Sequence, residues 1–561
     1  DPRAVIENKC NNSIARGWAP VGSHQVSLRL NPSQTERIIF VLGVAYQMGD
    51  EQATINKYKT DAHIQGELNK LQAYWDNNLG AYQASTPDAD VNTMVNIWNQ
   101  YQCRTTFNWS RSASYYESGI GRGMGFRDSC QDVLGFVHMI PAEARVRLID
   151  IASTQLEAGD AYHQYQPLTK KGAGGGFSDD HLWLILATAQ YMKESGDQGI
   201  LKENVPYNCG DGGASGTLYE HLNRALDFTM NHCGIHDIPL MLNADWNDCL
   251  NLNGDHKQAA SVFTAELFVF AAREMVRIAD LMNDAAGKAK YQKYVDEMCR
   301  RINEAAWDGK WFRRAWTEDG RMVGSAECAE GGQIYLLPQA WAVMANVADR
   351  ERLVSGMDSV KERLATEHGI QLHQPGYRQF DNSIGSITLY PAGLKENGAI
   401  FCHPNPWAVI AETMLGRGDR AFEYYKAILP AAKNEISDIR KTEPYVYCQM
   451  IAGKEHTEFG EGKNSWLTGT AAWNLFAVTA YILGVRAEYD GLQIDPAIPA
   501  SWDGFEVNRR FRNTAYRIQV KNPNHVSKGV KKITVDGAEI QGNVLPYRND
   551  NKEHLVEVVM G

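Results

Sequence analysis

Paired cysteines, long apolar runs and a leader pattern are all missing from this sequence. Its ten cysteines are scattered over 561 residues without a C-x-x-C pair or the density of a disulfide scaffold. No apolar stretch approaches the roughly 18 residues that a membrane-spanning helix requires. The opening DPRAVIENKC lacks the charged and then apolar order of a signal peptide, but it does not begin with Met, so upstream segments stay open. We expect a cytoplasmic protein with reduced thiols and no membrane association.

Basic runs and metal-binding spacings are also scarce. The 56 Lys and Arg face 67 Asp and Glu, for a net charge of −11, so nothing provides the positive field that nucleic-acid binding needs. No H-E-x-x-H, paired-cysteine or EF-hand spacing predicts a metal site. Gly119, Gly121, Gly123 and Gly125 lack the G-x-G-x-x-G spacing of a dinucleotide site. We therefore expect no nucleic acid, no metal and no cofactor.

The sequence does contain apolar residues at regular spacing, and this spacing changes along the chain from strand-like to helical and back to strand-like. Alternation in residues 22–43 predicts a hairpin, and because two strands alone are marginal in water, it reads as the end of a β-domain. Many apolar helical patterns joined by long loops predict an all-α barrel or toroid. The predicted order is the end of an N-terminal β-sandwich (1–49, mostly missing), a helical linker (50–90), a helical catalytic domain (91–485) and a C-terminal β-sandwich (486–561).

Five loops are rich in polar and aromatic residues where a purely structural loop needs only turn formers. Aromatic faces cover the apolar side of a sugar ring, and charged groups fix its hydroxyls, so such loops favour a carbohydrate site. The glycines of the first loop are expected to let the backbone turn so that Arg122, Arg127 and Asp128 point into one pocket. The loops cover 108–129, 161–169, 243–253, 394–407 and 463–474.

Seven blocks of this sequence resemble the cellobiose phosphorylase group within family 94 of the glycoside hydrolases. They are NIWNQYQCRTTFNWSRSAS, GIGRGMGFRDS, DAYHQYQPLTKKG, ADWNDCLNLN, KENGAIFCH, PYVYCQMIAGKE and KNSWLTGTAAWN. The resemblance implies a mainly α fold, with an (α/α)6 barrel as catalytic domain between the tail of an N-terminal β-sandwich and a C-terminal β-sandwich. It also implies a homodimer, in which the N-terminal domain helps to build the partner's site.

The chemistry implied by the resemblance is inverting phosphorolysis of a disaccharide. Phosphate is already an anionic nucleophile, so one carboxylic acid suffices if cationic and hydroxyl groups hold the phosphate. The resemblance assigns the general acid to Asp248, and Asp245 is the competing residue, with a structural role as loop cap as its alternative. It implies substrate binding by Arg122, Asp128, Trp246, Lys395, Glu396 and Gln449, and phosphate binding by Arg111, His403, Thr468 and Gly469. Tyr165 and Gln166 are added to the pocket on the character of their loop alone.

The expected substrate is a β-linked, cellobiose-like glucosyl disaccharide, cleaved to α-D-glucose 1-phosphate and a free sugar. Ser386 stands where the cellobiose-type pattern has Glu, and Pro404 where it has Asn, so the acceptor stays open. N,N'-diacetylchitobiose and cellobionic acid phosphorylases are the alternatives. The bulky side chain of Tyr390 disfavours a sugar with an N-acetyl group. A gluconate acceptor would need nearby cations, and residues 381–394 contain none. An inverting hydrolase and a non-catalytic sugar-binding protein are the rivals from other classes, and both leave the phosphate set unexplained.

Overall fold

The computed structural model of the chain describes residues 3–10, 12, 14, 22–43, 49–111, 122–167 and 169–561. These residues divide into two units, Asp1–Asp76 and Asn77–Gly561. Two glycines of the predicted pocket loop, Gly119 and Gly121, lie outside the described residues.

The first unit contains helices but, in its described part, no strand. Its elements are α1 (Arg3–Ile6), α2 (Asp50–Lys57) and most of α3 (Asp61–Leu79). Residues 22–43 belong to no helix or strand, and Leu28, Leu30 and Phe40 are exposed. The predicted hairpin is therefore wrong for this chain. Strands need neighbouring strands or a packed face for stability, and the described residues of this unit supply neither.

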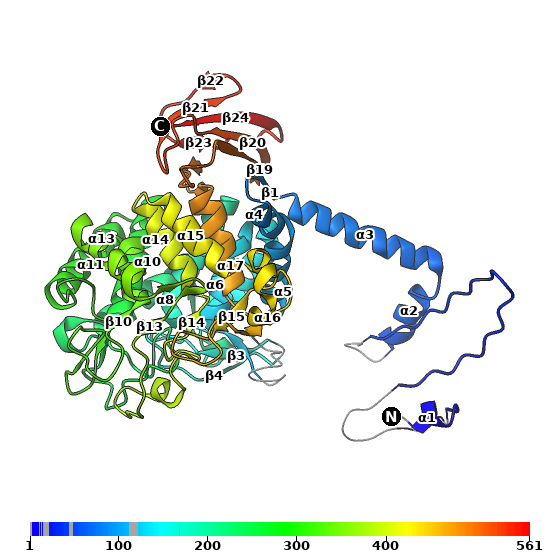
Figure 1. The fold of residues 1–561 in the computed structure, drawn as a ribbon, viewed down its shortest axis with the longest axis horizontal. Helices are drawn as coiled ribbons and strands as arrows, with labels where there is room; N and C mark the ends of the chain where they lie inside the picture. The colour runs from blue at the N-terminus through cyan, green and yellow to red at the C-terminus, as the bar shows by residue number, and fades with distance from the viewer. Residues whose placement is uncertain are drawn as a thin grey trace. The chain divides into compact units, whose positions relative to one another are not determined.

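Helices make up most of the second unit (Figure 1), and within the described residues they form an inner and an outer set. Each inner helix contacts the next in chain order, and the last contacts the first, so the set closes into a ring. The inner helices are α6 (Phe126–Phe136), α8 (Asp180–Ser195), α10 (Val262–Leu281), α12 (Leu336–Ala345), α14 (Asn405–Met414) and α17 (Thr470–Phe476). Packed outside them are α5 (Asn99–Trp109), α7 (Pro141–Ala152), α9 (Leu218–Asn231), α11 (Ala285–Ala305), α13 (Arg350–Arg363) and α15 (Gly418–Ile428).

The two sets follow from the distribution of apolar residues along each helix. Every residue of α12 is buried, as expected of a helix that is surrounded by others. The outer helix α11 instead buries one stripe at helical spacing, Gly287, Tyr291, Val295, Met298 and Ile302. A helix with a single apolar stripe can face the protein on one side only, so α11 belongs outside the ring.

Tryptophans fill the centre of the ring. Trp183, Trp341, Trp407 and Trp473 come from four different inner helices and are fully buried. The ring centroids of Trp341 and Trp407 lie 5.3 Å apart, and those of Trp407 and Trp473 lie 5.6 Å apart, with the rings edge to face. This geometry is the favoured one for aromatic pairs, and it makes the inside of the ring a packed core. Binding must therefore occur at an end of the ring.

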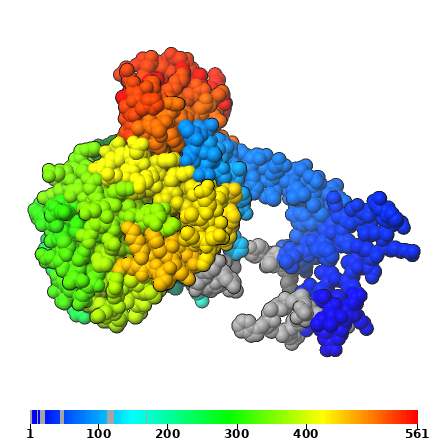
Figure 2. All heavy atoms as spheres, in the orientation of Figure 1, coloured from blue at the N-terminus to red at the C-terminus, as the bar shows by residue number. Residues whose placement is uncertain are grey.

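Two sheets lie at the C-terminal end of the chain, seen as the red lobe in Figure 2. Alternating burial along β19 and β20 matches the predicted period of two, and left-handed Asp536 and Gly537 form the predicted turn between β21 and β22. The six-stranded sheet has the order β1 (Tyr82–Ser85), β19 (Gly504–Phe511), β20 (Thr514–Lys521), β24 (Glu553–Met560), β21 (Val530–Val535) and β22 (Ala538–Glu539); β17 (Val485–Glu488), β18 (Gly491–Ile494) and β23 (Val544–Pro546) form the other.

Strand β1 corrects a predicted boundary. Its residues were assigned by the sequence to the helical linker of 50–90, but they pair antiparallel with β19, from Tyr82 opposite Arg509 to Ser85 opposite Glu506. Four residues are too short for periodicity to distinguish strand from helix. The partner strand, more than 400 positions later, decides the conformation.

Short strands connect the loops at the end of the ring away from the C-terminal sheet (Figure 1). They include β2 (Met124–Gly125), β3 (Gln164–Gln166) and β4 (Lys171–Ala173) in one sheet, and β14 (Ile400–Phe401), β15 (Cys448–Ile451) and β16 (Gly462–Ser465) in another. Separately, none of the helices in the described part of the chain combines the length and apolar composition needed to cross a bilayer.

Candidate active site

A cavity of about 190 Å³ opens among these loops. Four of the five predicted loops contribute to its wall. Its lining residues are Arg111, Arg122, Arg127, Asp128, Trp246, Asp248, Cys249, Tyr390, Lys395, Glu396, Phe401, His403, Gln449, Thr468 and Gly469. All the residues that the sequence predicts for catalysis, sugar binding and phosphate binding are in this set, with the exception of Tyr165 and Gln166.

Asp128 lies in a group of arginines at the start of α6. Arg111 Nη2 is 3.5 Å from its Oδ1, and Arg122 Nη2 is 3.6 Å from its Oδ2. Burial alone would raise the pKa of Asp128, but Arg111, Arg122 and Arg127 outweigh it and hold the pKa well below its usual range. Asp128 is therefore an acceptor of hydrogen bonds, suited to fixing sugar hydroxyls and unsuited to donating a proton.

The two aspartates of the ADWND segment have different surroundings. Asp245 is fully buried, pairs with Arg314 at 2.6 Å and accepts a hydrogen bond of 2.6 Å from Ser261 Oγ. Asp248 faces the cavity with 44% of its side chain exposed. Asp245 thus has the structural role that was its alternative, while Asp248 is the one that can reach a substrate. Asp248 is not buried, because the loop turns its carboxyl into the open cavity.

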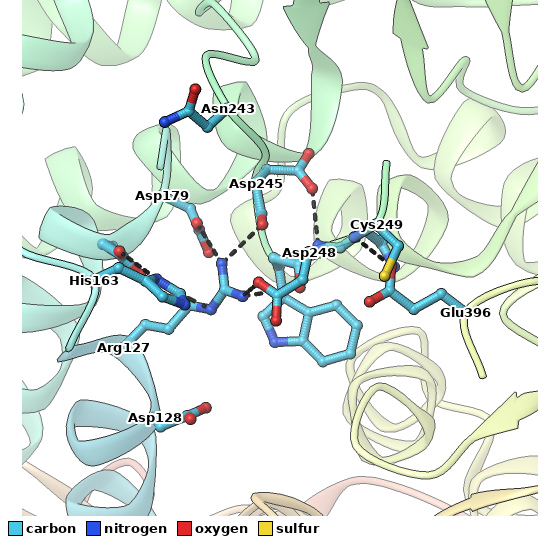
Figure 3. A network of polar contacts seen from close by, with 12 residues as sticks. Arg127, Asp128, His163, Asp179, Asn243, Asp245, Asp248, Cys249 and Glu396 are labelled. Carbon is cyan, nitrogen blue, oxygen red and sulfur yellow. Dashed lines mark hydrogen bonds and ion pairs between the residues drawn. The ribbon is translucent and has the colours of Figure 1, made fainter. Parts of the chain in front are cut away.

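Arg127 connects three parts of the site, as Figure 3 shows. Its Nη1 donates to Asp179 Oδ1 at 2.9 Å and to the carbonyl of Asp245 at 2.8 Å, and its Nη2 donates to Asp248 Oδ1. Only 5% of its side chain is exposed. The guanidinium therefore holds the ADWND segment to α8 and aims Asp248. The sequence placed Arg127 in the pocket, next to Asp128, but gave it no role.

Glu396 is the buried carboxyl of the cavity wall. Its Oε2 accepts hydrogen bonds of 3.2 Å from Asn247 Nδ2 and from the backbone N–H of Cys249. Burial, reinforced by repulsion from Asp248, raises the pKa of Glu396 to about 7. Glu396 can therefore retain a proton near neutral pH, in a position beside Asp248.

The predicted phosphate ligands come together from three segments. Arg111 follows α5, His403 follows β14, and Thr468 and Gly469 precede α17. A Cβ at Gly469 would lie 2.3 Å from His403 Cε1 and 3.0 Å from Arg111 Nη2, so only glycine lets the two side chains approach this backbone. A guanidinium, an imidazole, a hydroxyl and a backbone N–H at one corner are suitable ligands for an oxyanion.

Sugar-binding candidates line the rest of the cavity. Trp246 presents its ring there and packs edge to face on Phe401, with centroids 5.5 Å apart. Lys395 Nζ donates to Gln449 Oε1 at 3.1 Å, and Asn464 Nδ2 donates to the same oxygen at 3.0 Å. Phe401 and Cys249 line the cavity although the sequence reasoning did not select them. Cys249 directly follows Asp248 and Phe401 precedes His403 by two residues, and this proximity was the available signal.

Tyr165 and Gln166 do not line the cavity. Tyr165 is buried, and its hydroxyl donates to Asp150 Oδ2 at 2.8 Å. Its backbone pairs with Met124, and a Cβ at Gly123 would lie 2.7 Å from its carbonyl oxygen. Gln166 is exposed at the end of the same strand. The strand of Tyr165 and Gln166 therefore packs against the backbone of the pocket loop. Gly123 is needed for this close contact, and not for the tight turn that the sequence predicts.

Of the two residues that the sequence analysis connects with the acceptor sugar, Ser386 and Tyr390, only Tyr390 lines the cavity. Ser386 is outside the cavity wall, and its Oγ donates to Asn251 Oδ1 at 2.9 Å. It ties its turn to the ADWND loop. Tyr390 does line the cavity, with its hydroxyl 4.0 Å from Cys249 Sγ. Among the described residues, no group of three or more His, Cys, Asp or Glu side chains is placed to hold a metal ion.

The fold and the cavity define a helical-ring protein with a sugar-sized site and an oxyanion corner. The chain belongs to the glycosyl hydrolase 94 superfamily: residues 74–484 match the model of its catalytic domain, and residues 1–61 match its supersandwich domain. It is 37% identical to an N,N'-diacetylchitobiose phosphorylase of Vibrio proteolyticus, covering 100% of this chain and 72% of the relative. It is 31% identical to a solabiose phosphorylase of Paenibacillus borealis, covering 100% and 71%. The chain is thus an enzyme of the disaccharide phosphorylase type.

The fold is also similar to that of a solved structure from another glycosidase family. The GH78 rhamnosidase of Bacillus sp. GL1 superposes with a TM-score of 0.53 at 12% identity, over 86% of this chain and 44% of that one. At this identity the likeness concerns the fold alone.

Proposed function

We propose that this chain catalyses the inverting phosphorolysis of a neutral β-linked glucosyl disaccharide, releasing an α-sugar 1-phosphate and a free sugar. The observation that carries the proposal is the cavity itself, in which the oxyanion corner of Arg111, His403 and Gly469 shares one wall with Asp248. A non-catalytic sugar-binding protein has no use for that combination. The two phosphorylases that resemble the chain support the same reaction class.

The proposed mechanism assigns one role to each group. Asp248 gives its proton to the glycosidic oxygen as the bond to C1 breaks. Phosphate, held by Arg111 and His403, attacks C1 from the opposite face, so the β-linkage becomes an α-phosphate. Asp128 and Arg122 hold hydroxyls of the donor sugar, and Trp246 covers its apolar side. Lys395, Glu396 and Gln449 bind hydroxyls nearer the leaving group.

N,N'-diacetylchitobiose is the second candidate substrate. It is favoured by the relative from Vibrio proteolyticus, which is named as a phosphorylase of that disaccharide. Tyr390 favours the cellobiose-like substrate, since this bulky side chain lines the cavity and takes up room there. Ser386 no longer enters the argument, because it faces Asn251.

Further proposals concern architecture and assembly. The closed inner ring with its outer partners supports an (α/α)6 barrel, and the two C-terminal sheets support a β-sandwich. We keep the homodimer as a proposal from the family resemblance. All ten cysteines are free, which supports a reducing, cytoplasmic compartment.

The proposal is tested by incubating the protein with cellobiose or N,N'-diacetylchitobiose, with and without phosphate. We expect cleavage only with phosphate, an α-configured 1-phosphate as product, and no effect of EDTA. In reverse, glucose, N-acetylglucosamine and gluconate are offered as acceptors, with glucose 1-phosphate and N-acetylglucosamine 1-phosphate as donors. Cleavage without phosphate would instead make the chain an inverting hydrolase, with Glu396 available as its base. Preference for the N-acetylated sugars would select the second candidate.

Replacing Arg111 by Lys is expected to raise the KM for phosphate at least tenfold and to leave the KM for the disaccharide within a few fold. Lysine keeps the positive charge beside buried Asp132, which Arg111 Nη1 contacts at 2.5 Å, but it loses the planar fork that binds an oxyanion. Steady-state kinetics with each substrate varied in turn measures both constants.

The control is the same substitution at Arg104, seven residues earlier on α5, which pairs with Glu143 at 2.8 Å and is not part of the cavity wall. Arg104→Lys should leave both constants unchanged. Equal effects of Arg111→Lys on the two substrates would mean that Arg111 only supports the loop.

Activity is expected to fall as the pH rises above about 7. The acid step needs a proton near the glycosidic oxygen, and Glu396 holds one only below its pKa, which burial with repulsion from Asp248 raises to about 7. Above that value the protonated fraction declines about tenfold per pH unit. In Glu396→Gln this titrating carboxyl is gone, so the descending limb of the kcat/KM profile should move away from about pH 7. An unmoved limb would show that Glu396 takes no part in holding the proton.

A further inference from the structure

Gln131 lies behind the oxyanion corner and contacts the corner's histidine. It sits on α6, fully buried, and does not line the cavity. Its Oε1 is 2.8 Å from His403 Nε2 and accepts a hydrogen bond of 2.8 Å from Trp473 Nε1. Its Nε2 donates to the carbonyl of Arg127 at 3.3 Å. Every polar atom of this amide is therefore used.

The tryptophan determines which way the amide points. An indole N–H only donates, so the atom facing Trp473 must be the amide oxygen. The same oxygen faces His403 Nε2, which must therefore carry a hydrogen. Rotating the amide would place its NH₂ group against the indole N–H and its oxygen against the carbonyl of Arg127, at the cost of the hydrogen bonds to both.

The opposite edge of the imidazole borders the oxyanion corner. A Cβ at Gly469 would lie 2.6 Å from His403 Nδ1 and 3.0 Å from Arg111 Nη2, so Nδ1 and the guanidinium meet at the same backbone. Burial, together with Arg111, lowers the pKa of His403 to about 3. A neutral ring with hydrogen on Nε2 has a lone pair on Nδ1. The corner thus combines a guanidinium donor with an imidazole acceptor.

We propose that Gln131 is a positioning residue that fixes His403 as a hydrogen-bond acceptor, so that this corner selects an oxyanion carrying a proton, namely monohydrogen phosphate, over an unprotonated one. The inference rests on the proposed function for the place where the anion binds. Arg111 binds the charged oxygens, and the P–OH group donates to His403 Nδ1.

The proton balance of the reaction follows from this arrangement. An unprotonated oxygen of HPO₄²⁻ bonds to C1, the bond from C1 to the glycosidic oxygen breaks, and that oxygen takes the proton of Asp248. The P–OH proton stays on the product, a sugar phosphate monoanion. Because such a group has a second pKa of about 6, the product loses that proton at neutral pH. Asp248 then recovers one from solvent, and no net proton is consumed.

Sulfate provides the test, because it has the size and charge of monohydrogen phosphate but carries no proton at neutral pH. We expect the unmodified protein at pH 7.5 to bind phosphate at least ten times more tightly than sulfate in calorimetric titrations without sugar. The same ratio is obtained a second way, as the inhibition constant of sulfate against the KM for phosphate. Comparable affinities for the two anions would overturn the proposal.

Variants of Gln131 separate positioning from simple support. In Gln131→Glu a carboxylate beside His403 Nε2 favours the imidazolium, in which both nitrogens donate, so the phosphate preference should fall to about one or reverse. In Gln131→Met the ring is free to carry its hydrogen on either nitrogen, and the preference should fall several fold. A merely structural role would weaken both anions equally and leave the ratio unmoved, which would overturn the proposal.

Gln155 is the matched control. It is also buried, and its Oε1 faces a histidine, His221 Nδ1, at 2.7 Å, away from the cavity. Gln155→Met should leave the anion ratio unchanged. If turnover depends on phosphate but Gln131→Glu keeps the phosphate-to-sulfate affinity ratio of the unmodified protein, only this inference is overturned. If the unmodified protein does not bind phosphate at all, the proposed function is overturned as well.

Discussion

Replacing Asp248 by Asn is expected to lower kcat about a thousandfold without unfolding the protein. An amide cannot transfer the proton that the departing oxygen requires, and loss of a general acid typically costs 10² to 10⁴ in rate. The fold should survive because Asp248 is exposed to the cavity, and its partner Arg127 keeps Asp179 as a counter-charge. Initial rates of phosphorolysis and a thermal melt measure the two effects.

A substrate with a better leaving group makes this test sharper. An aryl β-glycoside needs little protonation of its leaving oxygen, so Asp248→Asn should lose much less activity on it than on the disaccharide. Asp255→Asn is the control, since its side chain is 80% exposed and lies outside the cavity wall. Near-normal activity of Asp248→Asn on the disaccharide would assign the acid to another residue, with Glu396 first.

Replacing Asp245 by Asn is expected to destabilise the protein by about 3–5 kcal/mol, the usual cost of leaving one member of a buried ion pair alone. Arg314 and Asp245 are both fully buried and 2.6 Å apart. Asp245 also accepts from Ser261 Oγ, and Ser261 caps α10 through Thr264 N. Denaturant or thermal unfolding should show the loss, in contrast to the stable but inactive Asp248→Asn.

A double variant tests whether the uncompensated charge is the cause. Asp245→Asn combined with Arg314→Met removes both charges, and it should be more stable than the sum of the two single losses predicts. Additive losses would show that the pair is not the source of the effect. An Asp245→Asn variant that is stable but inactive would reverse the roles of the two aspartates.

The pocket could be predicted from the sequence because its residues lie in blocks whose order and composition resemble one family. Eleven of the thirteen predicted site residues line one cavity, and Tyr165 and Gln166, chosen on loop character alone, do not. Composition places a residue in a loop, but it does not say which way the side chain points. The backbone pairing of Tyr165 with Met124 turns that ring into the core, where it meets Asp150.

Contacts between residues far apart in the chain could not be predicted from the sequence. Gln131 meets His403 across 272 positions and Trp473 across 342, and strand β1 meets β19 at the far end of the chain. Neither Gln131 nor the residues of β1 stand out in their own segments. Their roles arise from partners that only the closed ring and the C-terminal sheet bring within hydrogen-bond distance.

The sequence by itself determined the helical and strand periods of the second unit, the loops that form its site and the family to which the chain belongs. These depend on local patterns of apolar and polar residues, which act over a few turns of helix or a few residues of strand. The tertiary structure decided which aspartate is buried with Arg314 and which faces the cavity, because two carboxyls three residues apart differ only in their distant partners. It also decided that residues 22–43 form no hairpin in the described part of the first unit, since pairing requires neighbouring strands as well as the right alternation.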